Sequence, residues 1–336
     1  MNNYNVALLP GDGVGPELIQ ATCQVLDTVC RKSGTVSLSF TEYPFGENAY
    51  TSIGEALPKL TVDGIRNSDA TLLGAVSVKN VPSPSPIGAM RTLLDLYADI
   101  RVIRSWPGAW SLRQDIDLVC IRESTEGFLA DRSLYQGYGE WMPNPDQVLS
   151  LRVVTRQKSE RIARFAFEYA VTNSRKKITV LHKNGVLKLG CGLFLEAVGK
   201  VAAEYPEIEF TNEYIDNAAN HLITAPEDYD IILTTNLFGD IISDEAAALV
   251  SNLVPTANIG SGAVFLPVNH QHRPAEAGLG TINPLPTLIC AKMMLEHLGE
   301  RELAGTFHNS LCVALDKGAL SSRNTNQVVE LICAAL

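Results

Sequence analysis

The chain has 336 residues and a formal net charge of -10. This charge argues against nucleic acid and anionic membrane surfaces as partners, because both are themselves negative and would repel the protein at long range. A chain of this length exceeds one compact core, so we expect two α/β domains with room for a cleft between them.

The cysteines argue for a reducing environment. There are seven, an odd number, with no CxxC pair and no zinc-ligand spacing, at positions 23, 30, 120, 191, 290, 312 and 333. We therefore expect reduced, mostly buried thiols of a cytoplasmic protein. The first residues lack the basic and apolar regions of a signal peptide, and no apolar run reaches membrane-spanning length, so no membrane partner is expected.

Hydrophobic periodicity predicts strands and helices in alternation along the chain. Strands are expected at 5–9, 36–41, 70–75, 100–104, 117–122, 178–182 and 230–235. Helices are expected at 16–31, 87–97, 158–173, 191–204 and 241–252, with a final helix at about 284–298. This alternation is typical of an α/β fold with parallel strands covered by helices.

The segment GDGVGPE at 11–17 follows the first predicted strand. Its glycines turn the chain, and Pro16 stands where a helix favours proline, at its first position. The glycines fall at 11, 13 and 15, which is not the G-x-G-x-x-G spacing of a dinucleotide fingerprint. We therefore do not infer a Rossmann site from this turn.

Three arginines are candidates for binding an anionic ligand. Arg91 lies on a predicted helix, Arg101 on the next strand, and Arg122 at the end of a later strand. Each taken alone could equally be an ordinary surface residue. If all three face one cleft, they favour a ligand with two or three carboxylates or phosphates, since unpaired buried guanidinium groups are costly.

The stretch 130–148 is neither helical nor cleanly alternating, and it carries Tyr135, Tyr138 and Trp141. Exposed aromatic residues of this kind suggest an arm that packs on another subunit, while a plain surface loop is an equally good reading.

Lys183 directly follows the predicted strand 178–182. Beside a metal ion and arginines, the neighbouring positive charge would favour its neutral form and make it a proton acceptor. Without a metal ion and arginines nearby, Lys183 is better interpreted as an ordinary surface lysine.

Asp240 and Asp244 in NLFGDIISDEAAALV stand four residues apart, on one face of a helix that begins at a strand end. Two carboxylates there repel each other, and a divalent cation would resolve the repulsion; oxygen ligands suit Mg2+ or Mn2+. The alternative is a pair of N-terminal caps in a solvated turn. Asp216 in YIDNAANHL could supply a third carboxylate or be a cap.

Taken in order, these segments resemble the isocitrate and isopropylmalate dehydrogenase family, the β-decarboxylating hydroxyacid dehydrogenases. The motifs that carry the resemblance run from GDGVGPE through LDLYADIR, IRESTEG, HKNGVLKLGCGLF, YIDNAANHL and NLFGDIISDEAA to GTINP. The resemblance implies a two-domain α/β fold of the isopropylmalate dehydrogenase type, with parallel and mixed sheets flanked by helices, which is not a Rossmann fold. It places the cofactor-side domain at 1–98 plus 252–336, and a central domain at 99–251 with a dimerisation arm near 130–150.

The resemblance also assigns roles to residues. Arg91, Arg101 and Arg122 would bind substrate carboxylates. Mg2+ or Mn2+ would be held by Asp240 and Asp244 together with Asp216 of the partner subunit. Lys183 of the partner subunit would complete the site, so the resemblance implies a homodimer with shared active sites.

The implied reaction is oxidation of a 2-hydroxy acid followed by loss of its β-carboxylate. The metal lowers the pKa of the 2-hydroxyl, Lys183 accepts the proton, and hydride leaves for the nicotinamide. The same metal then stabilises the enolate formed when carbon dioxide departs.

The chain departs from the family pattern at three places. Leu129 stands where members usually carry a tyrosine that protonates the enol carbon. Either Tyr135, Tyr138 or water would replace it, or the reaction would stop short or run slowly. Gly185 stands where an asparagine is common. The adenosine-binding loop is replaced by NHQHRPAEAG at 269–278.

Cofactor choice is expected to depend on that loop. Glu276 favours NAD, because a glutamate beside a 2′-phosphate would be costly, whereas Arg273, His270 and His272 could favour NADP. Asn283 is the expected adenine contact.

Two further sets of residues are expected at the ligand sites. Gly74 and Ala75 are expected to lie against the cofactor. Ser85 and Ile87 are placed to touch the substituent of a 3-substituted malate, whose identity the stretch PSPSPIGAMR leaves open.

Two other functions stay open from the sequence. One is a non-catalytic or regulatory relative that binds a polycarboxylate beside an active subunit, which Leu129 and the altered loop would permit. The other is a 2-hydroxyacid dehydrogenase that does not decarboxylate.

Overall fold

The structure is a computed structural model that describes residues 1–81, 84–128, 139–268 and 272–336. The chain divides into two compact units. Unit 1 comprises Met1–Asp95, Ser105–Gln114 and Val250–Leu336, and unit 2 comprises Leu96–Arg104 and Asp115–Leu249. The boundaries expected near 98 and 251 differ from this division mainly in that Ser105–Gln114 pack with unit 1.

Unit 1 contains five strands. They are β1 (Asn2–Gly11), β2 (Val36–Glu42), β3 (Ala70–Ala75), β11 (Pro255–Ile259) and β12 (Ala263–Pro267). Their order is β2-β1-β3-β12-β11, with parallel pairing except between β11 and β12, which are antiparallel. Every residue of β3 is buried, which explains its uninterrupted run of small and apolar side chains.

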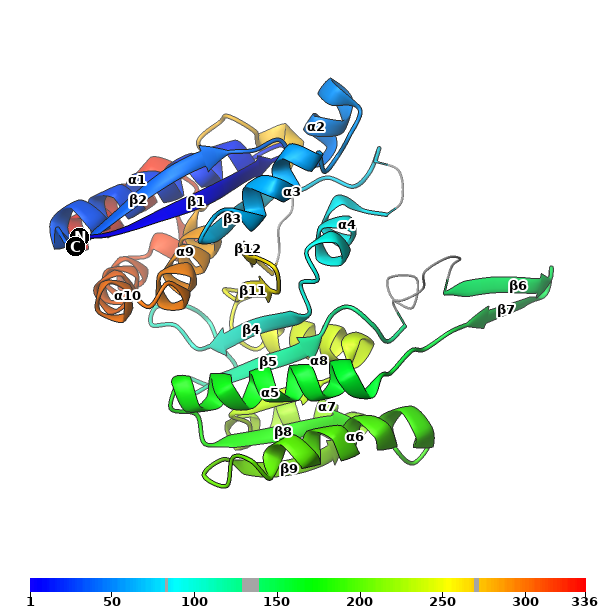
Figure 1. The fold of residues 1–336 in the computed structure, drawn as a ribbon. Coiled ribbons are helices and arrows are strands. Elements are labelled where there is room, and N and C mark those ends of the chain that lie inside the picture. The colour runs from blue at the N-terminus through cyan, green and yellow to red at the C-terminus, as the bar shows by residue number, and fades with distance from the viewer. Residues whose placement is uncertain (82–83, 129–138, 269–271) are drawn as a thin grey trace. The chain divides into compact units, whose positions relative to one another are not determined.

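Helices of unit 1 cover these strands (Figure 1). They are α1 (Gly15–Ser33), α2 (Gly46–Ile53), α3 (Lys59–Arg66), α4 (Pro86–Leu93), α9 (Leu285–His297), α10 (Arg301–Asp316) and α11 (Thr325–Ala335), with short 3-10 turns at Pro274–Glu276 and Ala319–Ser321. The helices α1 and α9 pack directly on the strands, and α10 and α11 pack on them. Gly34 ends α1 in the left-handed conformation, with φ 66°.

Two sequence predictions in unit 1 are wrong, one in where a helix ends and one in which helix is the last. The helix expected at 87–97 ends at Leu93, because the chain turns at Asp95, which adopts φ 43°, and a strand follows. The helix at 284–298 is found but is not the last one, since α10 and α11 follow it. Leu303, Phe307, Leu311 and Leu315, four residues apart, mark the buried face of α10.

Among the described residues of unit 2, five strands pair side by side, apart from a separate hairpin. They are β4 (Ala98–Arg104), β5 (Asp117–Glu123), β8 (Lys177–His182), β9 (Glu209–Tyr214) and β10 (Ile231–Thr234). Their order is β4-β5-β10-β8-β9, antiparallel between β4 and β5 and parallel elsewhere. The expected α/β class with mixed strands flanked by helices is confirmed.

Helices lie on both faces of the unit 2 strands, with α5 and α6 on one face and α7 and α8 on the other (Figure 1). Their bounds are α5 (Arg156–Thr172), α6 (Lys188–Ala202), α7 (Ile215–Thr224) and α8 (Asn236–Ala248), with a 3-10 turn at Pro226–Asp228. The helix α8 begins at Asn236 rather than at 241, directly after β10. This earlier start puts the five residues of the NLFGD segment, more than one helical turn, on the helix.

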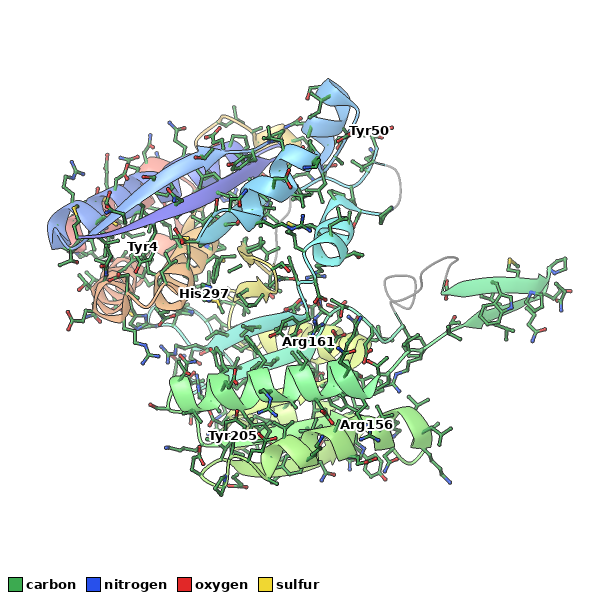
Figure 2. The ribbon with its side chains drawn as sticks, in the orientation of Figure 1. Tyr4, Tyr50, Arg156, Arg161, Tyr205 and His297 are labelled. Carbon is green, nitrogen blue, oxygen red and sulfur yellow. The ribbon has the colours of Figure 1, made fainter. Side chains whose placement is uncertain are left out.

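Ion pairs tie α5 to α6. Arg156 reaches Glu196 at 3.0 Å and Arg164 reaches Glu204 at 2.8 Å. Figure 2 labels Arg156 near one end of the α5–α6 pair and Tyr205 near the other end. These exposed pairs each add little stability, so the helices are held chiefly by the buried apolar side chains beneath them.

A separate antiparallel hairpin is formed by β6 (Glu140–Asn144) and β7 (Gln147–Ser150), and all its residues are exposed. Among them are the large side chains of Trp141 and Met142. This hairpin occupies the later part of the expected arm, while 129–138, including Leu129, Tyr135 and Tyr138, lies outside the described residues. Whether the hairpin packs on another subunit stays a prediction.

All seven cysteines are free thiols, four of them buried. Burial raises the pKa of Cys23 and of Cys120 to about 12, and that of Cys30 to about 11. Within the described part of the chain, no helix has both the length and the apolar character that a membrane span requires.

These thiols are expected to resist alkylation in the native protein. A thiol with a raised pKa carries almost no thiolate at pH 7.5, so iodoacetamide should label Cys23, Cys30 and Cys120 more than about tenfold more slowly in buffer than in urea. Peptide mass spectrometry after timed labelling measures this ratio for each cysteine. Equal labelling of Cys120 in both conditions would show that the unit 2 core opens readily.

Candidate active site

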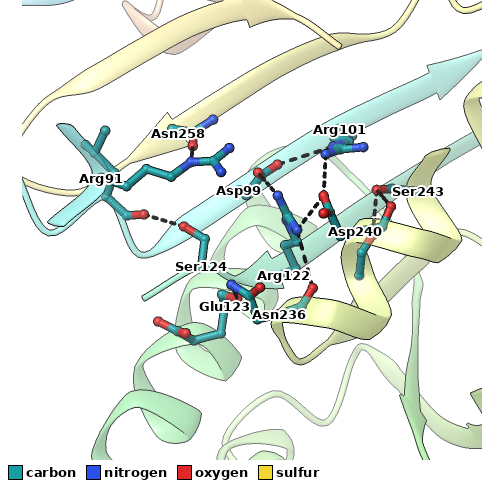
Figure 3. A network of polar contacts seen from close by, with 12 residues as sticks. Arg91, Asp99, Arg101, Arg122, Glu123, Ser124, Asn236, Asp240, Ser243 and Asn258 are labelled. Carbon is teal, nitrogen blue, oxygen red and sulfur yellow. Dashed lines mark hydrogen bonds and ion pairs between the residues drawn. The ribbon is translucent and has the colours of Figure 1, made fainter. Parts of the chain in front are cut away.

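The antiparallel pairing of β4 with β5 gathers charged side chains in unit 2. In this register Asp99 stands directly opposite Arg122, and Arg101 follows two residues after Asp99, on the same face of β4. Asp99 Oδ2 accepts a hydrogen bond from Arg122 Nη2 at 2.9 Å, and Asp99 Oδ1 lies 3.6 Å from Arg101 Nε. Figure 3 shows the two guanidinium groups converging on this carboxylate.

The helix α8 adds two carboxylates to the same cluster. Asp240 Oδ1 lies 2.7 Å from Arg122 Nη1 and 3.0 Å from Arg101 Nη2. One turn further along α8, Asp244 Oδ1 accepts a hydrogen bond from Arg101 Nη1. The side chains of Asp240 and Asp244 are 50% and 66% exposed, whereas Asp99 is fully buried, so the cluster has an inner and an outer side.

The two arginines are not surface residues, since Arg101 is 7% exposed and Arg122 is 4% exposed. Burial lowers the pKa of Arg122, but the nearby carboxylates of Asp99 and Asp240 more than offset this, so the pKa is raised. Asp240 and Asp244 are the fifth and ninth residues of α8, which rules out the reading that they cap its N-terminus. In this structure the arginines are paired with the chain's own carboxylates.

Lys183 and Asp216 form a second polar group in unit 2. Lys183 follows β8 directly, as expected, and its Nζ donates to Asp216 Oδ1 near the start of α7. The hydrogen bond from Lys183 lowers the pKa of Asp216. Both side chains remain partly exposed, so the pair is open to a ligand or another chain.

A divalent cation fits the oxygen donors of Asp240 and Asp244, which are the ligands that Mg2+ and Mn2+ prefer. The described residues of one chain do not bring three His, Cys, Asp or Glu side chains together as a metal cluster. To hold a cation, Asp240 and Asp244 would need further ligands beyond these two carboxylates.

In unit 1, Ser85 and Ile87 lie at the start of α4, and Arg91 lies in its last turn. Ser85 caps the helix, because its Oγ accepts a hydrogen bond from Gly88 N at 3.1 Å. Arg91 Nε donates to Asn258 Oδ1 at 2.6 Å, which fixes the arginine against β11. The Ser85 hydroxyl keeps its own O–H donor beside this capping bond. The roles toward a substrate that the sequence indicated for Ser85, Ile87 and Arg91 stay predictions.

Gly74 and Ala75 end β3 beside the glycine-rich turn. The Ala75 carbonyl accepts a hydrogen bond from Asp12 N at 2.7 Å. A Cβ on Gly74 would collide with the backbone of Pro10 and Gly15, so glycine is needed for this close approach. The buried Asp12 carboxylate in turn accepts from the backbone N–H groups of Asn48 and Ser77. These hydrogen bonds hold the turn firmly against the end of β3. The sequence indicated this close packing only through the glycines of the turn.

A pocket of about 670 Å³ lies within unit 1. Its lining residues are Arg273, Glu276, Thr281, Asn283 and Leu320 to Arg323. Arg273 and Glu276 face each other at 3.7 Å, both about half exposed. Asn283 Nδ2 donates to the carbonyl groups of Ala319 and Leu320, so this side chain shapes the pocket wall. Of the loop 269–278, residues 269–271, and with them His270, lie outside the described residues.

Three residues of the charged cluster were missed by reasoning from sequence: Asp99, Asn236 and Gly239. Asn236 accepts from Arg122 Nη1 at 3.3 Å through its carbonyl and donates from its side chain to the Glu123 carbonyl at 3.1 Å. A Cβ on Gly239 would collide with the side chain of Arg122. The sequence could have indicated Gly239, because a glycine inside a helix often marks a close packing contact.

Comparison with known proteins gives consistent matches over the whole chain. The family model described as isocitrate/isopropylmalate dehydrogenase matches residues 5–330. A 3-isopropylmalate dehydrogenase of Methanothermobacter thermautotrophicus is 37% identical over 324 residues, covering 96% of this chain and 93% of that protein. An isocitrate/homoisocitrate dehydrogenase of Thermus thermophilus is 38% identical over 321 residues, covering 94% and 92%. The crystal structure of isocitrate dehydrogenase from Methylococcus capsulatus superposes with a TM-score of 0.87 at 34% identity, covering 99% of both chains.

Proposed function

The chain belongs to the isocitrate/isopropylmalate dehydrogenase family, and from this premise we propose that it oxidises and decarboxylates a malate with a substituent at carbon 3. Enzymes of this family transfer hydride to NAD or NADP and use Mg2+ or Mn2+. The observation that carries the proposal is the cluster in which Arg101 and Arg122, both buried, face Asp240 and Asp244. Such a cluster can bind a carboxylate and a divalent cation side by side.

Arg101 and Arg122 are proposed to bind the substrate's carboxylates. Planar guanidinium groups make bidentate hydrogen bonds to carboxylates, and here their forks already point at carboxylate oxygens of the protein. Arg91 is proposed as the third arginine. Ser85 and Ile87, at the start of the same helix, are proposed to contact the substituent on carbon 3.

Asp240 and Asp244 are proposed to hold the divalent cation together with Asp216 of the partner subunit. A cation at these two carboxylates would take over the charge compensation that Arg101 and Arg122 supply in this structure. Both guanidinium groups could then turn their Nη atoms to the substrate. The family is commonly dimeric, and the proposed homodimer shares its active sites between subunits.

When bound, the cation supplies a Lewis acid that acidifies the 2-hydroxyl and stabilises the charge left when carbon dioxide departs. Lys183 Nζ is proposed to accept the hydroxyl proton while hydride leaves carbon 2 for the nicotinamide, which turns the alcohol into a ketone. Asp216, bonded to Lys183 Nζ, holds the amine in position. The arginines keep the carboxylates oriented through both steps.

NAD is the proposed cofactor, with NADP as the alternative. The pocket of unit 1 is proposed to bind its adenosine half, with Glu276 accepting hydrogen bonds from the ribose hydroxyls and Asn283 beside the adenine. A 2′-phosphate placed there would lie against the Glu276 carboxylate, although Arg273 and Arg323 line the same pocket. Gly74 and Ala75 are proposed to form the part of the surface nearest the nicotinamide.

The experiment that tests the function is nicotinamide reduction by the purified protein in the presence of Mg2+ or Mn2+. NAD and NADP are each assayed against isocitrate, homoisocitrate, 3-isopropylmalate, malate and tartrate. We expect reduction with one of the 3-substituted malates, faster with NAD, and loss of activity in excess chelator. One carbon dioxide should be released for each cofactor reduced.

Other outcomes separate the alternative functions. Cofactor reduction without carbon dioxide release would identify a 2-hydroxyacid dehydrogenase that does not decarboxylate. Binding of a polycarboxylate with no reduction of either cofactor by any member of the panel would favour a non-catalytic or regulatory relative. Activity that persists in excess chelator would contradict the metal role of Asp240 and Asp244.

Gly239→Ala is expected to displace Arg122 and to raise the KM for the substrate about tenfold, because the new methyl group occupies the space of the Arg122 side chain. Steady-state kinetics measures the change, and thermal denaturation checks that the variant folds. Gly199→Ala is the matched control, since Gly199 also lies within a helix but has no neighbour within 4 Å of the added Cβ. An unchanged KM in Gly239→Ala would show that Arg122 adjusts freely.

A further inference from the structure

Asp99 is a fully buried carboxylate to which the proposed reaction gives no task. Its side chain is fully buried, and it is not one of the proposed metal ligands. A buried carboxylate is costly unless it is paired. Asp99 is paired with both arginines of the site, so its role must be sought in what it does to them.

The contacts of Asp99 lie on the inner side of both guanidinium groups. It holds Nη2 of Arg122 at 2.9 Å and stands 3.6 Å from Nε of Arg101. The donors that face the partly exposed Asp240 and Asp244 are Nη1 of Arg122 and both Nη atoms of Arg101. Asp99 therefore fixes the direction in which Arg122 presents its outer hydrogen-bond donor, and its charge attracts Arg101 from the same side.

The negative charge of Asp99 also lowers the net positive charge that the cluster presents to an anion. Two guanidinium groups, three carboxylates and a divalent cation together carry one net positive charge. Without the charge of Asp99, the same groups would carry two net positive charges. Because Asp99 is buried, solvent and salt screen its field only weakly, and each additional carboxylate on a substrate is repelled by it.

We propose that Asp99 is a positioning residue that also sets substrate preference, favouring a malate with two carboxylates over one with three. This inference rests on the proposed function, in which Arg101 and Arg122 bind the substrate. It narrows the substituent on carbon 3 to an uncharged one.

The test is equilibrium binding to the full chain by calorimetry, in Mg2+ and without cofactor, using 3-isopropylmalate as the probe with two carboxylates and isocitrate as the probe with three. The wild-type protein is expected to bind 3-isopropylmalate more tightly. Asp99→Asn keeps the size and one acceptor oxygen but removes the charge. It is expected to shift the ratio of the two affinities about tenfold toward isocitrate.

Asp117→Asn is the matched control. Asp117 is also a carboxylate on the β4–β5 pair that bridges two arginines, Arg104 at 2.7 Å and Arg175 at 2.5 Å, away from the charged cluster. Its substitution should leave the ratio unchanged. Thermal denaturation checks folding, and Asp99→Ser, also uncharged, replaces Asp99→Asn if the latter does not fold.

Three results would count against the inference. An unchanged ratio in Asp99→Asn, or a fall in both affinities by the same factor, would show that Asp99 only holds the arginines in place. A wild-type preference for isocitrate would contradict the stated specificity. If the wild-type protein binds neither probe, the proposed function itself is overturned and the inference falls with it.

Discussion

Asp240→Asn is expected to lower kcat on the order of 10³-fold while leaving the variant folded and dimeric. Asparagine keeps an Oδ1 that can accept the hydrogen bonds from Arg101 and Arg122, so the cluster should hold its shape. What it loses is the negative charge that a divalent cation needs. Steady-state turnover and Mn2+ binding followed by electron paramagnetic resonance measure the two effects, and gel filtration reports the assembly.

The comparison variant for Asp240→Asn is Glu245→Gln, which removes a partly buried carboxylate from the same helix. It should leave Mn2+ binding and turnover close to those of the wild-type protein. Wild-type Mn2+ affinity in Asp240→Asn would contradict the assignment of this aspartate as a ligand. A loss of turnover with intact Mn2+ binding would move Asp240 to a role in holding the arginines.

Purified mixed dimers of Lys183→Met and Asp240→Asn subunits are expected to recover about half of wild-type activity, although each variant alone is inactive. In a mixed dimer, the site built on Asp240 of the Lys183→Met subunit receives Lys183 from the other subunit and is complete. The other site lacks both residues, so each mixed dimer has one complete site of two.

The mixing experiment uses co-expression of the two variants with different affinity tags, followed by purification on both tags and assay. Wild-type subunits carrying the same two tags provide the reference activity. If Lys183 serves the site of its own chain, both sites of a mixed dimer are damaged and no activity returns. The experiment therefore decides whether the active site is shared, separately from the identity of the substrate.

Sequence reasoning predicted the family and the fold class, and both are confirmed. Ordered motifs served better than local periodicity, which missed α10 and α11 and began α8 five residues late, at 241 rather than Asn236. It also missed β9, which pairs only with β8 at an edge of unit 2 and alternates little in burial. Edge strands with mostly polar residues lack the pattern on which the prediction depends.

Of the candidate site, the sequence identified Arg101, Arg122, Asp240 and Asp244, and the structure brings these four together. Their roles toward substrate and metal stay predictions. The sequence did not indicate that the arginines pair with the aspartates in the absence of ligand, because spacing along the chain says nothing about which charges face each other across strands. Asp99 was missed for the same reason, since its importance appears only in the register of β4 with β5.

That register has a consequence for how the chain folds. Two oppositely charged pairs, Asp99 with Arg122 and Arg104 with Asp117, stand across from each other near the two ends of the β4–β5 pair. A slip by two residues would set Arg101 against Arg122 in one direction, or Asp99 against Cys120 in the other, and a slip by one would turn every side chain to the wrong face. Each misaligned pairing would bury an uncompensated charge, which costs several kcal/mol. The charged residues proposed to face a ligand therefore also favour the native alignment of β4 with β5. Folding intermediates in which these strands are misaligned are disfavoured before the active site has formed.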